Sequence, residues 1–268
     1  MNLVQFRQYR QKWWAKGWPW LTAGLFVGTA VWFIWQKRLR PRFWHWVERN
    51  TADEVLYFVP LPPDRKFIAL TIDDAPHPEV TPQILATLRE YEVHATFFVV
   101  GEQVAGNEAL LEQIVAEGHE LGNHLMRIEP SISKSTAEFE AELLTTDKLL
   151  RQFFTAVRWF RPGSGWYNQD MLQIISRHGY RAVLGSIYPY DAQFTAVDFV
   201  DFMVDYILRR AHPGRIIIVH DGLAERIRVI EVLRRVLPEL QAQGFEIVTL
   251  SHLVHLGEAE TNKERQPT

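Results

Sequence analysis

Cysteine is absent from this chain of 268 residues. No disulfide can therefore form, and no thiolate is available as a nucleophile or a metal ligand. A large net charge is also lacking, since the formal value is −3, and hydrophobic residues make up 47% of the chain. This composition excludes a disordered or collagen-like protein and is typical of a packed globular one. The lack of cysteine does not identify the cellular compartment, because an exported domain of this size buries enough surface to fold without disulfides.

Positive charge and tryptophan are concentrated at the beginning of the chain. Residues 1–50 contain nine lysines and arginines against one acidic residue, whereas residues 51–268 contain twenty against thirty-one. Eight of the ten tryptophans lie within the first 46 positions. The chain therefore divides into a short segment that is basic and aromatic and a longer segment that is acidic.

A transmembrane anchor is predicted over residues 17–36. This stretch carries no charged residue and is close to the ~20 residues that cross a hydrocarbon core. Cations flank it on both sides, and tryptophans bracket the apolar run at the level where headgroups are expected. A buried core helix explains these flanks less well, and a cleaved signal peptide fits poorly because no small-residue cleavage site follows the apolar run. The charges do not form one patch, so we expect no nucleic-acid partner.

The rest of the chain is predicted to form four further parts. Residues 1–16 are a basic N-terminal segment, and residues 37–66, with four prolines, are a juxtamembrane linker. Residues 67–256 form the folded domain, and residues 257–268 form a polar, mobile tail. The cations close to the anchor number four before it and five after it, so the positive-inside rule does not decide its orientation.

From residue 67 onward, short apolar runs alternate with amphipathic stretches. Strands that are apolar throughout and alternate with helices are typical of a parallel sheet covered on both faces. About seven such units favour an α/β fold in which the sheet closes, or nearly closes, into a (β/α) barrel. The expected strands are 67–72, 95–100, 120–123, 157–160, 181–185, 215–219 and 245–250, and the expected helices are 81–91, 108–117, 135–153, 169–178, 196–210 and 224–243.

Polar residues follow four of the expected strands directly. In a parallel barrel the carboxyl ends of the strands meet at one mouth, where active sites form. Taken singly, each residue has an ordinary explanation as a turn, a helix cap or a surface cation. Their joint placement at separate strand ends favours a shared site. The residues are Asp73 with Asp74, His124, Arg161, and His220 with Asp221.

Five motifs occur in a fixed order along the expected domain. They are TIDDAP at 71–76, ATFFVVG at 95–101, GHELGNH at 118–124, FRPGSG at 160–165 and VHD at 219–221. The ordered set resembles the polysaccharide deacetylases, the NodB-homology family, although no single motif would be specific. The resemblance implies that the barrel is a distorted one of seven or eight strands.

The same resemblance implies a metal-dependent hydrolase of a non-peptide amide bond, which removes acetyl groups from N-acetylglucosamine units of a glycan. Asp73 would be the general base, His220 the general acid, and Arg161 would hold the base in place. Asp74 and His124 would bind a divalent metal, zinc or a similar transition metal, that lowers the pKa of bound water and polarises the carbonyl. These roles suit the chemistry, because an amine leaves only when its nitrogen receives a proton.

The chain departs from the family pattern at the second metal-binding histidine. The family has two histidines four residues apart, and here the second position is Ile128, which cannot bind a metal. Asp74 and His124 alone are one protein ligand short of the usual three for a catalytic zinc. We expect Glu129 or His77 to complete the site if a metal is bound.

Four further residues are predicted to contact the substrate. The rings of Tyr188 and Tyr190 suit the faces of pyranose sugars, although packing of their proline-containing loop would explain them equally well. Trp166 follows the arginine motif and would shape the substrate groove or cap the barrel. Asp191 lies in the region where the family often has aspartates that orient the acid histidine.

Three functions stay open at this point. The first is a single-pass membrane protein whose extracytoplasmic domain removes acetyl groups from an N-acetylated glycan with the help of a metal. The second is a hydrolase of another amide, such as a cyclic one, that uses Asp73, Arg161 and His220 without a tightly held metal or with an altered one. The third is a non-catalytic, glycan-binding module on a membrane tether.

Overall fold

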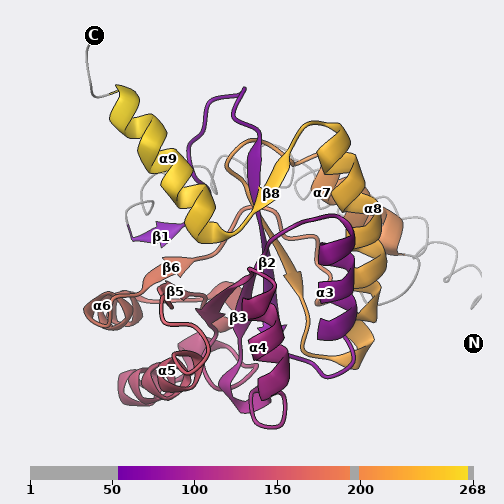
Figure 1. Cartoon of the computed structure of the whole chain (residues 1–268). Helices are drawn as coiled ribbons and strands as arrows, with labels where there is room; N and C mark the ends of the chain where they lie inside the picture. Colours follow the sequence, from indigo (N-terminus) through magenta and orange to yellow (C-terminus); the bar gives the residue numbers. More distant parts are fainter. Residues whose placement is uncertain (1–53, 194–198, 265–268) are drawn as a thin grey trace, which may run out of the picture. The chain divides into compact units, whose positions relative to one another are not determined.

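The computed structural model describes residues 54–193 and 199–264 of the chain (Figure 1). The predicted basic segment at 1–16 and the predicted anchor at 17–36 lie outside these ranges. Among the described residues, no helix is both long enough and apolar enough to cross a membrane.

An eight-stranded parallel sheet forms the centre of the described domain. Its order is β1-β6-β5-β4-β3-β2-β7, and β8 pairs with β2 as well. The strands are β1 (Val55–Leu56), β2 (Phe67–Ala75), β3 (Thr96–Val99), β4 (Glu120–Asn123), β5 (Trp159–Phe160), β6 (Arg181–Val183), β7 (Ile216–His220) and β8 (Glu246–Val248).

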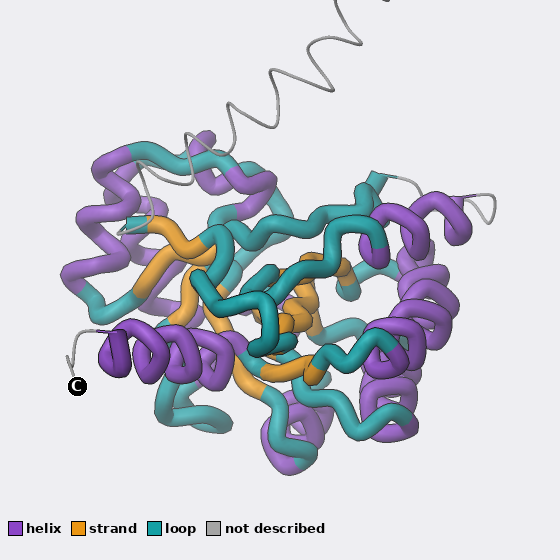
Figure 2. Tube along the Cα trace, turned by 90° about the horizontal axis from the view of Figure 1, so that it is seen from above, coloured by secondary structure: helices purple, strands orange, loops and turns teal. Residues whose placement is uncertain are grey.

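Helices follow most of these strands and surround the sheet. Seen from above, the strands occupy the middle of the domain and the helices lie around them (Figure 2). The helices are α3 (Thr81–Glu90), α4 (Glu108–Ala116), α5 (Thr136–Leu150), α6 (Gln169–Arg177), α7 (Val200–Leu208), α8 (Arg228–Ala242) and α9 (Leu250–Glu264). The predicted parallel α/β architecture is therefore confirmed.

The sheet curves into a barrel-like form that is joined only by single bridges between its two ends. Ile187, just after β6, forms an isolated parallel bridge with Ile217 of β7, and Phe58, just after β1, forms an antiparallel bridge with Arg215. These two bridges connect the β1–β6 end of the sheet to β7. The carboxyl ends of the strands consequently face one common region.

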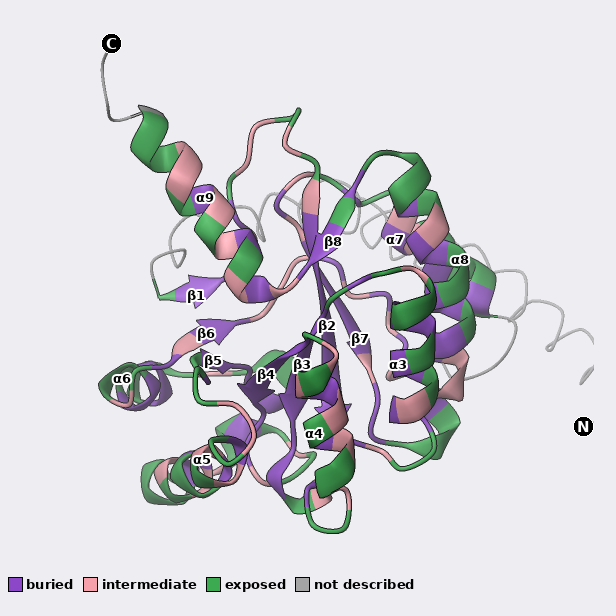
Figure 3. Ribbon diagram, viewed as in Figure 1, coloured by how far each residue is buried: buried purple, intermediate pink, exposed green. Residues whose placement is uncertain are grey.

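Strand β2 organises the domain because it is the longest strand and has three neighbours. It pairs with β3 on one edge, and on the other edge β7 pairs with its residues 69–73 and β8 with its residues 67–69. All of its residues after Phe67 are buried, which fits the predicted strand that is apolar throughout (Figure 3). The strand runs three residues beyond the predicted end and so includes Asp73 and Asp74.

Two residues of the predicted linker at 37–66, Val55 and Leu56, form strand β1 of the sheet. The strand has only two residues, too few for an alternating or apolar pattern to be visible in the sequence. Both residues are buried, and they pair with Ala182 and Val183 of β6. Burial of two apolar side chains and completion of the β6 edge explain why this segment joins the domain.

The segment predicted as a mobile tail, 257–268, is helical over the residues that the structure describes. Helix α9 continues through this segment to Glu264. Its first turns carry Leu250 and Leu253, which are fully buried in a cluster that includes Leu56 and Val59. Because the helix is anchored by this apolar face, its polar continuation extends it and does not form a separate coil.

We expect replacement of Gly214 by alanine to destabilise the domain by more than about 2 kcal/mol. Gly214 has a φ of +79°, and an added Cβ would lie 1.7 Å from the carbonyl oxygen of Val59. Its own carbonyl accepts a hydrogen bond from the Val59 amide at 2.9 Å, so the two segments cannot simply separate. Urea unfolding followed by tryptophan fluorescence measures the loss.

Gly106→Ala is the matched control. Gly106 has a φ of +84°, but nothing lies within 4 Å of its Cβ position. It should therefore show only the left-handed backbone cost, about 1–2 kcal/mol. Equal losses in the two variants would contradict the close approach of Val59 to Gly214.

Candidate active site

Asp73 and Asp74 lie buried at the carboxyl end of β2, each with 3% of its surface exposed. Successive side chains of a regular strand point to opposite faces. Here the pairing of β2 with β3 shifts register between Asp73 and Ala75, and Asp74 has a φ of +64°. A left-handed backbone is uncommon for a residue other than glycine and is often found at functional sites. This irregularity places the two carboxylates against different sets of partners.

Arg161 is the first partner of Asp73. Its Nη1 donates to Asp73 Oδ1 and, at 2.8 Å, to the hydroxyl of Thr71. Its Nε donates to the carbonyl of Val183 at 3.1 Å, and its Cζ lies 4.1 Å above the ring of Phe98. Because the guanidinium is 2% exposed and held on several sides, it fixes one oxygen of Asp73.

His220 is the second partner of Asp73, and Asp191 holds its ring. His220 Nε2 lies 3.8 Å from Asp73 Oδ2, and Nδ1 lies 3.1 Å from Asp191 Oδ1. The His220 amide also donates to Asp191 Oδ2 at 2.6 Å. Burial acts to lower the pKa of His220, but the charge and hydrogen bond of Asp191, together with Asp73, outweigh it, so this pKa is raised. The imidazole is thereby favoured in the protonated form that an acid requires.

His124 and Arg226 are the partners of Asp74. His124 Nε2 lies 3.3 Å from Asp74 Oδ1, and its Nδ1 donates to the carbonyl of Arg161 at 2.7 Å. Arg226 Nη1 donates to the other oxygen, Asp74 Oδ2. Burial acts to raise the pKa of Asp74, but the hydrogen bond from His124 and the nearby positive charges hold it well below its usual range. Asp74 is therefore a buried carboxylate with both oxygens engaged.

The residues around Asp74 do not fit the predicted divalent metal. In the described ranges, no group of three histidine, aspartate or glutamate side chains is arranged to hold an ion. Ile128 is 39% exposed and has no donor atom, and Glu129 forms an ion pair with Lys134. His77 Nδ1 accepts hydrogen bonds from the amides of Glu79 and Val80, at 3.2 and 3.3 Å.

In the described structure neither Glu129 nor His77 completes a zinc-like site with Asp74 and His124. Glu129 faces a lysine near the surface, and the ring of His77 belongs to the turn before α3. The cation that contacts Asp74 is the guanidinium of Arg226.

Among the residues predicted to contact the substrate, Tyr188 borders the candidate site. Its ring centroid lies 5.5 Å from that of His220 and 5.2 Å from that of Tyr190. Burial is the main cause that raises the pKa of Tyr188 to about 12. Trp166 is 67% exposed. Asp191 contacts the ring of His220, and this contact fits the prediction that Asp191 orients the histidine.

Arg226 belongs to the site although no sequence pattern predicts it there. The expected helix 224–243 begins instead with a short 3₁₀ turn, Ala224–Ile227, before α8. This turn leaves Arg226 only 8% exposed, whereas an arginine at the start of an amphipathic helix would ordinarily be solvated. No spacing in the sequence distinguishes it from the neighbouring arginines.

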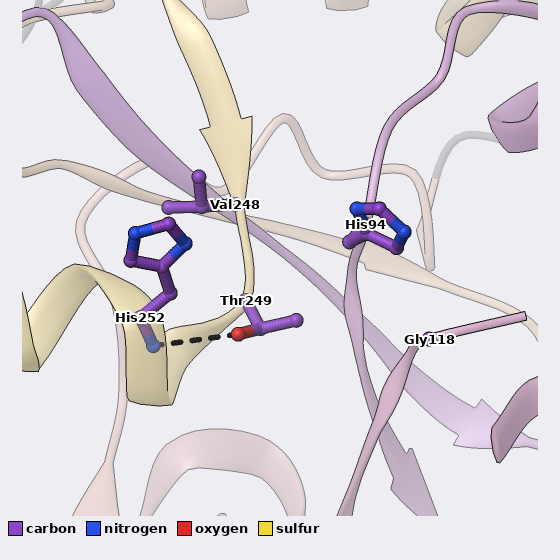
Figure 4. Close-up of a pocket in the computed structure, with 5 residues that line it drawn as sticks. All are labelled: His94, Gly118, Val248, Thr249 and His252. Atoms are coloured by element: carbon purple, nitrogen blue, oxygen red, sulfur yellow. Dashed lines mark hydrogen bonds between the residues drawn. The ribbon is translucent and has the colours of Figure 1, made fainter.

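A separate pocket lies between the segments that precede β3 and β4 and the carboxyl end of β8 (Figure 4). It is lined by His94, Gly118, Val248, Thr249 and His252. His94 and Gly118 precede β3 and β4, and none of the predicted site residues is among the lining residues. This pocket is therefore distinct from the cluster around Asp73.

Comparison with known proteins gives consistent relatives. Residues 61–183 match the family model described as polysaccharide deacetylase. A peptidoglycan-N-acetylglucosamine deacetylase from Bacillus cereus is 36% identical over 194 residues, covering 72% of this chain and 91% of that protein. A solved peptidoglycan N-acetylglucosamine deacetylase is similar in fold, with a TM-score of 0.71 and 24% identity over 76% of this chain and 95% of the other.

A second solved structure is described as a CE4 family pseudoenzyme from Bacillus anthracis. It has a TM-score of 0.66 and 26% identity to this chain, and the match covers 75% of this chain and 68% of that one. Both solved structures agree with the parallel, barrel-like architecture described above.

We expect Asp221→Asn to flatten the pH dependence of stability. Asp221 is fully buried, and burial raises its pKa from 3.8 to about 7, although Thr81 and the amide of Gly222 oppose the shift. Between these two values the unfolded chain has released a proton that the folded chain keeps, so this group makes stability fall as pH rises. The asparagine variant lacks that titration.

Urea unfolding of the wild type and Asp221→Asn on both sides of this pH window measures the effect. Asp64→Asn, at an exposed carboxylate in the turn before β2, serves as the control and should keep the wild-type pH slope. An unchanged slope in Asp221→Asn would show that this carboxyl group does not titrate as described.

Proposed function

Because the chain belongs to the polysaccharide deacetylase family, as its motifs predicted, we propose that it hydrolyses the acetamide group of an N-acetylglucosamine-containing glycan. Family membership makes it a polysaccharide deacetylase-like amidohydrolase. The single observation that carries the proposal is the row of contacts Arg161–Asp73–His220–Asp191. It joins a fixed carboxylate to an imidazole whose protonated form is favoured.

In this proposal Asp73 acts as the base. Its Oδ1 is engaged by Arg161, which leaves Oδ2, on the side of His220, to accept a proton from water. The water oxygen bonds to the carbonyl carbon of the acetamide, and the π electrons of the carbonyl move to its oxygen. A tetrahedral intermediate results.

His220 acts as the acid that completes the reaction. When the intermediate collapses, the C=O bond forms again, the C–N bond breaks, and protonated His220 gives its Nε2 proton to the leaving nitrogen. The products are the free amine and acetic acid, which ionise to ammonium and acetate. The proton on Asp73 then returns to His220 and restores the starting state.

The residues beside the Arg161–Asp73–His220–Asp191 row favour a glycan as the substrate. The ring of Tyr188 packs beside His220, and a ring in that place suits an apolar sugar face. The Bacillus cereus relative is named for a peptidoglycan N-acetylglucosamine substrate. We further propose that residues 17–36 anchor the chain in a membrane and that the domain faces the extracytoplasmic glycan.

A second candidate function is non-catalytic glycan binding. The pairing of Asp74 with Arg226 in place of a three-ligand metal site favours it. The complete Arg161–Asp73–His220–Asp191 row favours hydrolysis, and acetate release separates the two. Hydrolysis of another amide, such as a cyclic one, would use the same row and would show as product formation without acetate.

We expect the full chain to release acetate from N-acetylated chitooligosaccharides, and Asp73→Asn and His220→Gln to lose about 100-fold or more of this rate. Each variant removes one of the two proton-transfer groups while changing little volume. Enzymatic acetate determination and mass spectrometry of the sugar give the rate. His255→Gln, at an exposed histidine of α9, is the control and should retain the wild-type rate. Glycan binding by the wild type without acetate release would overturn the hydrolytic function.

Asp191→Asn should move the alkaline limb of the kcat profile to lower pH. The charge of Asp191 is the leading contribution that raises the pKa of His220, so its removal lets His220 lose its proton earlier as pH increases. Acetate release measured across the pH range at saturating substrate tests this. A uniform loss of rate with an unmoved limb would mean that Asp191 acts only in packing.

A further inference from the structure

Arg226 is held against Asp74 by both its side chain and its loop. Its Nη1 donates to Asp74 Oδ2 and, at 2.7 Å, to the carbonyl oxygen of Asp221. The residue is 8% exposed, so the ion pair is largely removed from water. One guanidinium nitrogen of Arg226 thus connects the Asp74 carboxylate with the loop after β7.

The loop that carries Arg226 packs directly on the backbone of Asp74. Gly222 has a φ of +79°, and a Cβ added there would lie 2.3 Å from the Asp74 carbonyl oxygen and 2.6 Å from its Cβ. The amide of Asp221 donates to the carbonyl of Asp73 at 2.8 Å. The close approach therefore depends on glycine, and it brings the loop that carries Arg226 next to Asp74.

Each oxygen of the Asp74 carboxylate already has a partner. Oδ1 faces His124 and Oδ2 is paired with Arg226. An ion bound there would have to displace a guanidinium and would meet its positive charge at contact distance, where repulsion in a buried site is strong. Ile128 occupies the position four residues after His124, where the family pattern has a second histidine.

We propose that Arg226 takes the place of a metal ion as the counter-ion of Asp74, so that this chain excludes divalent metals from the site. A consequence, which rests on the proposed function, is that acetate release proceeds without a bound metal. Arg226 acts here as a positioning residue: it neutralises Asp74 and keeps it beside His124. Asp73 and His220 stay in place to move protons.

Zinc binding by the full chain tests the exclusion independently of activity. After equilibration with excess Zn²⁺ and dialysis, the wild type should retain no stoichiometric zinc by elemental analysis. Arg226→Gln removes the positive charge and one partner of Asp74, so its zinc affinity in calorimetric titration should rise at least about tenfold. Adding His124→Gln to this variant should abolish the gain.

Arg228→Gln is the matched control, since it removes the same charge two residues further along the chain. Among the described residues, the side chain of Arg228 forms no ion pair or hydrogen bond, so its replacement should leave zinc affinity at the wild-type value. Arg226→Lys keeps the charge and should also bind no zinc. Circular dichroism checks that each variant is folded, and the wild-type titration decides the question even where a variant is not.

The outcomes separate this inference from the proposed function. One tightly bound zinc per wild-type chain, lost in His124→Gln, would overturn the exclusion of metal. Acetate release that stops on chelation and returns with zinc would overturn it too, while supporting the function. Zinc exclusion as described, with no acetate release from any N-acetylated glycan, would uphold the role of Arg226 and refute the hydrolytic function.

Discussion

The burial of two adjacent carboxylates at the end of β2 is the constraint on which the site depends. A buried carboxylate without a partner costs several kcal/mol, so the fold must supply positive groups. It supplies two buried guanidinium groups from distant segments, Arg161 after β5 and Arg226 before α8. Neither arginine could be buried without its aspartate, and neither aspartate without its arginine. Strands, loops and side chains around β2 are arranged to satisfy both pairs at once.

The two pairs have different consequences for chemistry. Arg161 engages one oxygen of Asp73 and leaves the other facing His220, so this carboxylate is held and still available for a proton. Arg226 and His124 engage both oxygens of Asp74, so that carboxylate is closed. Two aspartates that are neighbours in sequence thus have different surroundings, one with an oxygen facing His220 and one with a partner on each oxygen. Buried ion pairs contribute little net stability, and here they determine where the charges of the site lie.

Much of the fold follows from local pattern. The mostly apolar runs predicted at 67–72 and 215–219 are strands, because most side chains of a strand buried on both faces are apolar. Elements that are stabilised mainly by contacts with distant parts of the chain were not predicted. Val55–Leu56 is too short to show a period and exists because β6 offers an edge, and α9 extends past the predicted domain because its first turns are buried.

For the site, the sequence pattern predicts which residues end the strands, and a parallel sheet brings all of its carboxyl ends to one side. That rule was enough to bring Asp73, Asp74, His124, Arg161 and His220 together. What each oxygen of the two aspartates contacts is visible only in the folded chain. The choice between a metal and Arg226 depends on a 3₁₀ turn and on a glycine that lets one loop lie on Asp74, and both result from packing between segments about 150 residues apart. Local sequence does not predict this close approach, because the contacts that stabilise it exist only after the chain has folded.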